Sequence, residues 1–133
     1  MNPHYALVAA RAGHRCEYCH APEAVVNFPF EVEHVIPPNR GGEQTPENRA
    51  LACRSCNLFK SDFVSAVDPD TGQNSRLYHP RSDRWLDHFA VAPGPCELRG
   101  LTPIGRATIA QLRMNNAPQL LARLQWLRLG LFP

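Results

Sequence analysis

The sequence predicts an α+β fold in one compact domain, and three observations lead to this prediction. Residues 30–36 alternate around Val and Ile, as is typical of a short strand. Residues 1–15 and 117–129 carry apolar side chains at helical spacing instead. Thirteen prolines in 133 residues indicate many short elements. A chain of this length supports one domain with an appended extension, but not two full domains.

The first half of the chain predicts a helix, a strand and a loop in that order. An N-terminal helix is expected within residues 1–15, where Tyr5, Val8 and Ala12 follow helical spacing. The strand at 30–36 is ended by two consecutive prolines, and the glycines of residues 39–42 indicate a loop. Residues 49–52 fit a strand or a helix equally well by pattern alone.

The second half predicts a turn, a hairpin and two helices. Residues 68–72 have the composition of a turn. Residues 86–91 and 96–101 are expected to pair as a hairpin across residues 92–95. Thr102-Pro103 begins a helix over 103–114, and a second helix follows from about 117 to 129, with Leu120, Leu124 and Leu127 as its apolar stripe. Further apolar surface at Trp126 and Leu131 predicts either docking on the domain or a homodimer.

The charge is distributed unevenly along the chain. The net charge is only +2, but residues 98–133 contain five arginines and no acidic residue. Thirteen of the 14 basic residues are Arg, and Lys60 is the single Lys. No stretch approaches the roughly 18 apolar residues of a membrane span, and the N-terminus lacks the pattern of a signal peptide. We therefore expect a cytoplasmic protein without membrane association.

Four of the five cysteines form two pairs with the C-x-x-C spacing: Cys16 with Cys19, and Cys53 with Cys56. Two such pairs can present four thiolates to one ion, which predicts a structural zinc site. The alternative is a pair of disulfides in a secreted domain, which would leave Cys96 unpaired. We expect Cys96 to be a small buried side chain or a surface thiol, and we expect none of the nearby histidines to ligate zinc.

The cysteine pairs and the segment between them resemble the zinc-containing branch of the HNH endonuclease family, as seen in small bacterial members. The motif covers about residues 16–62, and its positions occur in this order: Cys16-x-x-Cys19, Glu33-His34-x-x-Pro37, Arg40-Gly41-Gly42, Asn48 and Cys53-x-x-Cys56-Asn57-x-x-Lys60. The resemblance implies a ββα-metal unit with a strand near 31–36, an Ω-like loop, a strand near 49–52 and a helix from about 55. It implies a nuclease unit at residues 1–66, with residues 67–133 as an extension packed on it.

The resemblance also implies roles for individual residues in hydrolysing a DNA phosphodiester bond. His34 matches the general base, and Asn48 matches the asparagine that holds the loop of the histidine. Glu33 and Asn57 match the ligands of a catalytic divalent ion such as Mg²⁺, although the family more often has Asp at the first position. Lys60 and Arg40 are expected to contact phosphate. Adjacent strand residues point to opposite faces, so Glu33 and His34 reach one phosphate only if the strand bends.

Two questions stay open at this point. The arginines of the C-terminal part form either a phosphate-contacting surface or the solvated faces of helices, and the predicted DNA contacts among them are Arg99, Arg106 and Arg113. His79 and His88 lie in a segment that resembles a stretch found after the HNH unit in a subset of small bacterial family members, and packing is favoured there over metal or DNA contact. The competing function is a zinc-stabilised nucleic-acid-binding module without cleavage, and a third is an interaction domain that binds no nucleic acid.

Overall fold

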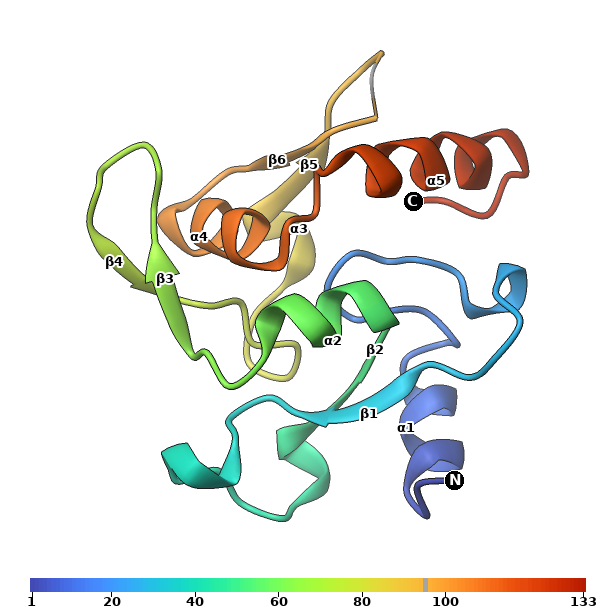
Figure 1. Cartoon of the computed structure of the whole chain (residues 1–133), viewed down its shortest axis with the longest axis vertical. Helices are drawn as coiled ribbons and strands as arrows, with labels where there is room; N and C mark the ends of the chain where they lie inside the picture. The colour runs from blue at the N-terminus through green and yellow to red at the C-terminus, as the bar shows by residue number, and fades with distance from the viewer. Residues whose placement is uncertain (95) are drawn as a thin grey trace.

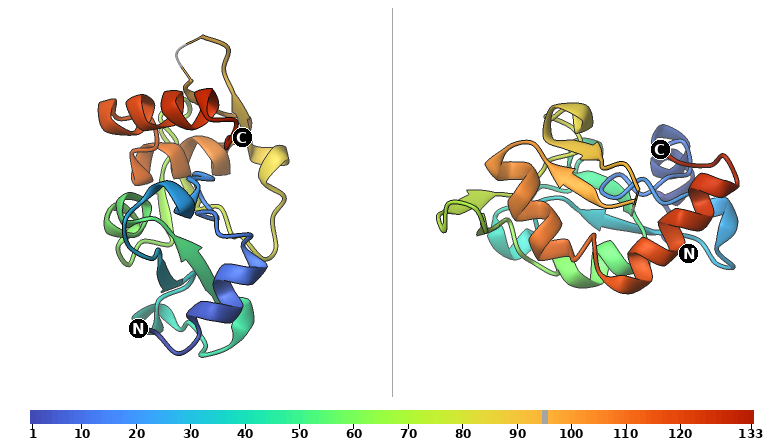
Figure 2. Two further views of the ribbon diagram at one scale, coloured as in Figure 1. Left: turned by 90° about the vertical axis from the view of Figure 1, so that its right-hand side faces the viewer. Right: turned by 90° about the horizontal axis from the view of Figure 1, so that it is seen from above.

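The computed structural model describes residues 1–94 and 96–133. The mixed α+β architecture predicted from the sequence is confirmed, with three two-stranded antiparallel sheets among the described residues. Figure 1 shows α1, β1, β2 and α2 in one part of the molecule and β5, β6, α4 and α5 in the other, and the views in Figure 2 show the same two-part arrangement. Within these described ranges, no helix has the length and apolar character needed to cross a membrane.

The first part is built on a ββα unit. Strand β1 (Glu31–His34) pairs antiparallel with β2 (Arg49–Ala52), with Glu31 opposite Ala52 and His34 opposite Arg49. Helix α2 (Arg54–Lys60) follows directly and lies against the sheet (Figure 1). Residues 49–52, which the pattern alone left open, are therefore a strand. The expected N-terminal helix is α1 (Tyr5–Arg11), and it contacts both strands.

Short 3-10 turns connect these elements. They are η1 (Glu23–Val25), η2 (Pro38–Arg40) and η3 (Pro46–Asn48). Two of them, η2 and η3, begin with proline, whose fixed φ suits the first position of a helical turn. Both lie in the loop between β1 and β2, so parts of this loop have regular backbone geometry.

The second part begins with a hairpin of β3 (Ser65–Val67) and β4 (Asn74–Arg76). The predicted turn at 68–72 lies at its tip, where the Gly72 amide donates to the Asp68 carbonyl at 2.8 Å. Helix α4 (Pro103–Leu112) packs against β3, β4 and α2. It starts at the predicted residue, and the Thr102 hydroxyl caps it by accepting from the Gly105 amide.

The predicted hairpin at 86–101 is shorter than expected. Strands β5 (Phe89–Val91) and β6 (Leu98–Gly100) pair antiparallel, but residues 86–88 belong to helix α3 (Trp85–His88). A tertiary contact explains the helical turn, because the Trp85 Nε1 donates to the Tyr18 carbonyl at 2.8 Å and the Trp85 ring stacks on His20. Pro95, within the predicted connection, lies outside the described residues.

Helix α5 (Ala117–Arg128) has the predicted bounds within one residue but buries a different face. The buried positions are Gln119, Arg123 and Trp126, whereas Leu120, Leu124 and Leu127 are half-buried. The predicted leucine stripe therefore lies beside the most buried face of the helix, and Leu127 from it packs against the core. The charged Arg123 side chain can be buried because its guanidinium donates hydrogen bonds to two backbone carbonyl groups in the interior.

Candidate functional site

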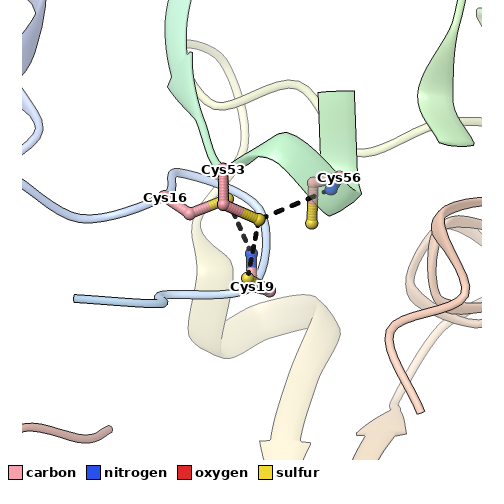
Figure 3. A group of neighbouring side chains, drawn as sticks. All are labelled: Cys16, Cys19, Cys53 and Cys56. Atoms are coloured by element: carbon pink, nitrogen blue, oxygen red, sulfur yellow. Dashed lines mark hydrogen bonds between the residues drawn. The ribbon is translucent and has the colours of Figure 1, made fainter. Parts of the chain in front are cut away.

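The four cysteines of the two C-x-x-C pairs converge on one point (Figure 3). Their Sγ atoms all lie within 4.8 Å of one another and all four side chains are buried. The Cys19 and Cys53 Sγ atoms are 3.7 Å apart. A tetrahedral zinc ion with Zn–S bonds of about 2.3 Å separates its sulfurs by about 3.8 Å. The donor set, the spacing and the burial therefore fit a structural zinc ion.

Each cysteine pair sits on a local structure that orients its sulfurs. The Cys19 amide points to the Cys16 Sγ at 3.5 Å, and the Cys56 amide points to the Cys53 Sγ at 3.4 Å. Cys53 is also the N-cap of α2. Hydrogen bonds from Cys16 and Cys19 lower the pKa of the Cys53 thiol, whereas hydrogen bonds within the same cluster raise the pKa values of Cys19 and Cys56. A zinc ion held here ties the loop after α1 to the start of α2.

His34 is the last residue of β1, and its imidazole is half-buried at the edge of the loop. Its Nε2 lies 2.9 Å from Oε1 of Gln44. The neighbouring side chain, Glu33, points to the other face of the strand, into the interior. The strand thus separates the two residues as the regular alternation of a strand requires.

Asn48 holds the loop that follows His34. Its Oδ1 accepts from the Ile36 amide at 2.9 Å, and its Nδ2 donates to the carbonyls of Ile36 at 2.9 Å and Glu43 at 2.8 Å. Gly42 is required at the crossing point, because a Cβ there would lie 1.7 Å from the Ile36 carbonyl oxygen. One buried amide side chain therefore joins both ends of the loop.

Lys60 and Glu33 form an ion pair in the interior. The Lys60 side chain is 1% exposed, and its Nζ lies 3.0 Å from the Glu33 Oε2. The remaining Lys60 donors reach the carbonyls of His34 at 3.2 Å and Val35 at 2.9 Å. Tyr18, between the first two cysteines, donates its hydroxyl to the other Glu33 oxygen. Burial raises the pKa of Glu33, and the Lys60 charge opposes that increase.

Asn57 contacts a carboxylate that the sequence motif did not single out. Its Nδ2 donates to Glu31 Oε2, and the other Glu31 oxygen accepts from Arg54 at 3.0 Å. Glu31 lies two residues before Glu33, so both side chains face α2. This period of two is the signal that could have identified Glu31 from the sequence.

The donors near α2 match a hard divalent cation by type, because carboxylate and amide oxygens are its usual ligands. Their placement matches less well. Both Glu33 oxygens accept hydrogen bonds in the interior, and Asn57 is bonded to Glu31 instead. As placed, Glu33 and Asn57 do not form an open cation site, and ligation of an ion by these two residues stays a prediction.

The arginines predicted to contact DNA have different surroundings. Arg106 binds both oxygens of Asp68 at 2.9 Å, and the Arg113 guanidinium lies 4.5 Å from the centre of the Phe59 ring. The Arg40 Nε donates to the Asp62 carbonyl at 2.9 Å. Arg99 is exposed on β6. Three of these four arginines therefore have partners within the chain, and DNA contact by each of the four stays a prediction.

The histidines of the extension have contacts within the chain. His88 Nδ1 lies 2.7 Å from the Thr102 hydroxyl, and its ring packs edge-on against Tyr78. The His79 amide donates to Asp83 at 2.8 Å, and its Nδ1 accepts from the Arg81 amide at 3.2 Å. These contacts support packing and turn formation as the role of this segment.

Residues 16–63 match the family model described as HNH endonuclease. This segment is therefore similar to HNH endonuclease domains. The matched segment contains both cysteine pairs and the residues from Glu33 to Lys60 described above. No curated protein and no solved structure matches the chain. An HNH domain of this kind indicates a nuclease-type function.

Proposed function

We propose that the protein is a metal-dependent endonuclease that hydrolyses phosphodiester bonds in DNA, with His34 as the general base. The observation that carries the proposal is the HNH domain, with His34 at the end of β1 beside a loop that Asn48 fixes. An imidazole is suited to accept a proton from water near neutral pH. Its half-buried position leaves the ring accessible to a substrate phosphate.

The metal ions have separate parts in this proposal. Zinc on Cys16, Cys19, Cys53 and Cys56 would hold the two cysteine pairs together and take no part in the reaction. A catalytic ion, Mg²⁺ or a similar cation, would neutralise phosphate charge. Glu33 and Asn57 are its predicted ligands, and Glu31 is the second carboxylate to be compared because it contacts Asn57.

A plasmid nicking experiment tests the enzyme assignment. Purified protein is incubated with supercoiled plasmid with Mg²⁺, with Mn²⁺ or with EDTA, beside a His34→Ala variant. We expect nicking with a divalent cation and its loss in EDTA. A positioned general base contributes about 10²–10⁴-fold to rate, so His34→Ala should lose activity on that scale. Equal nicking by both proteins would overturn the role of His34. Binding without nicking under any cation would favour a nucleic-acid-binding module.

A matched pair of variants tests the ion ligands. Glu33→Gln and Glu31→Gln each remove one negative charge and keep the shape of the side chain. Binding of Mn²⁺ to the zinc-loaded protein is measured by electron paramagnetic resonance, together with the Mg²⁺ dependence of nicking. If Glu33 is the ligand, only Glu33→Gln weakens Mn²⁺ binding. Weakening by Glu31→Gln alone would assign the ion to Glu31 and contradict the predicted ligand.

A further inference from the structure

Gln44 provides the one side-chain hydrogen bond to the His34 ring that we find among the described residues. The Gln44 Oε1 lies 2.9 Å from His34 Nε2. The sequence motif does not single out this residue, which lies in the loop between the glycines and Asn48. Gln44 contacts one of the two ring nitrogens of His34, and such a contact influences which nitrogen carries the proton.

The backbone around Gln44 is fixed from two sides. Asn48 donates to the carbonyl of Glu43, the preceding residue, at 2.8 Å. Arg49 donates to the Gln44 carbonyl at 3.3 Å, and Arg49 is the cross-strand partner of His34. The same Asn48 side chain that closes the loop therefore also fixes the backbone next to Gln44.

The chemistry of the two side chains then fixes the roles of the ring nitrogens. A glutamine Oε1 only accepts hydrogen bonds, so this contact is a hydrogen bond when the His34 Nε2 carries the proton. In a neutral imidazole the other nitrogen then holds the free lone pair. For His34 this nitrogen is Nδ1. We propose that Gln44 is a positioning residue that holds His34 as the Nε2–H tautomer and leaves Nδ1 to accept the proton of the attacking water. This inference rests on the proposed function for its catalytic part.

Two substitutions of opposite hydrogen-bonding character test the proposal. Gln44→Glu keeps an acceptor against Nε2, whereas Gln44→Lys presents only donors and favours the tautomer protonated at Nδ1. We expect Gln44→Glu to retain kcat within a few-fold. Gln44→Lys should lower kcat by at least about tenfold, out of the 10²–10⁴-fold that a general base supplies. KM for plasmid should not rise in Gln44→Lys, because the added positive charge favours DNA binding.

Thr45→Lys is the matched control. It adds the same charge one residue further along, where the Thr45 side chain makes no capping hydrogen bond. We expect it to keep the wild-type kcat. An equal loss of kcat in Thr45→Lys and Gln44→Lys would overturn the role of Gln44, because the loss would then follow the charge and not the contact with the ring.

Nitrogen-15 NMR of the zinc-loaded protein gives a readout that does not depend on activity. At a pH where the imidazole is neutral, the shifts of Nδ1 and Nε2 report which nitrogen is protonated. We expect the Nε2–H form for the wild type and Gln44→Glu, and a shift toward Nδ1–H in Gln44→Lys. A wild-type ring protonated at Nδ1, or unchanged populations in Gln44→Lys, would overturn the inference. If the tautomers behave as expected while no variant nicks DNA, the proposed function fails and the contact stands.

Discussion

Lys60 shows how far the surroundings of one residue can differ from the role that its type suggests. A lone lysine on a motif helix predicts phosphate contact, but Lys60 uses its donors on Glu33 and on the carbonyls of His34 and Val35. Its ammonium thus connects the end of α2 to the backbone at the proposed base. The sequence could not predict this burial, because lysine is almost never fully buried unless it is paired, and its partner lies 27 residues away.

Removal of the Lys60 charge should destabilise the fold strongly. Lys60→Met leaves the Glu33 carboxylate buried beside Tyr18 without its cation, and breaking a buried ion pair costs about 3–5 kcal/mol. The free energy of unfolding is measured by urea denaturation of the zinc-loaded protein. The double variant Lys60→Met/Glu33→Gln should recover part of the loss, because no charge is then buried. A double variant no more stable than Lys60→Met would contradict this account.

The pH dependence of Lys60→Met follows from the same pair. Burial raises the pKa of Glu33, and Lys60 opposes the increase, so the pKa rises further in the variant. A carboxyl whose pKa is higher in the folded state than in the unfolded state favours folding when it is protonated. The stability gap between Lys60→Met and wild type should therefore narrow as the pH is lowered from about 7 toward 5. A constant difference in stability across this pH range would show that the unpaired charge of Glu33 does not cause the destabilisation of Lys60→Met.

At the scale of elements, one carboxylate joins the β3–β4 hairpin to α4. Asp68 is buried at the hairpin turn, where it accepts two hydrogen bonds from Arg106, one from the Thr71 hydroxyl and one from the Asp70 amide. The Arg106 hydrogen bonds are the main cause that lowers the pKa of Asp68 to about 2. Arg106, predicted as a DNA contact, therefore also has a structural partner within the chain.

Asp68→Asn should destabilise the protein near neutral pH, with a smaller effect in acid. A carboxyl with a depressed pKa stabilises the fold above its unfolded pKa of about 3.9, and this contribution is lost as the pH falls toward about 2. The difference between wild type and Asp68→Asn in urea midpoint should thus shrink between about pH 5 and pH 2. Asp70→Asn is the control, because its exposed carboxylate lies 3.2 Å from the same guanidinium. The same loss of stability and the same pH dependence in Asp70→Asn would contradict a specific contribution of the buried Asp68 carboxylate.

The elements also show which parts of the fold the sequence could predict. Local signals were sufficient for α1, for α4 with its Thr102 cap and for the turn at 68–72, because each depends on neighbours in the chain. The strand at 49–52 was ambiguous, and only the family resemblance indicated it. The turn of α3 and the buried face of α5 were missed because Trp85 and Arg123 find their partners on distant segments. In the site, Asn48 was predicted from the motif, whereas Glu31 and Gln44 were not.

At the scale of the whole molecule, the four-cysteine centre lies at the junction between segments far apart in the sequence. Elemental analysis should find about one zinc per chain that survives mild EDTA. Removal of the zinc by a strong chelator should reduce the helical circular dichroism signal, because the segment with Cys16 and Cys19 is then no longer joined through the metal to the start of α2. Cys56→Ser should lose the zinc, whereas Cys96→Ser, outside the cluster, should retain it. Retention of zinc in Cys56→Ser would contradict the four-cysteine site.

Arg123 joins three segments of the C-terminal part to one buried guanidinium. Its Nη1 donates to the Cys96 carbonyl at 2.9 Å, and its Nη2 donates to the Met114 carbonyl at 2.7 Å. The guanidinium also lies 5.8 Å from the centre of the Phe132 ring. Burial lowers the pKa of Arg123, and nearby cysteines oppose that effect. The approach to β6, the end of α4 and the C-terminus therefore all depend on one side chain of α5.

Arg123 and Arg128 lie on the same helix, α5. Comparing variants of the two residues distinguishes a phosphate-contacting role of the C-terminal arginines from a structural or solvating role. Hydrogen bonds to charged donors contribute about 1.5–3 kcal/mol each, so Arg123→Met should lower the free energy of unfolding by at least about 3 kcal/mol. Arg128 is exposed, so Arg128→Ala should leave stability within about 0.5 kcal/mol. If Arg128 contacts a DNA phosphate, its variant should instead reduce the salt dependence of DNA binding by about one slope unit. An unchanged slope would assign Arg128 to solvation of the helix, and equal stability losses in the two variants would contradict the role of Arg123 as an internal anchor.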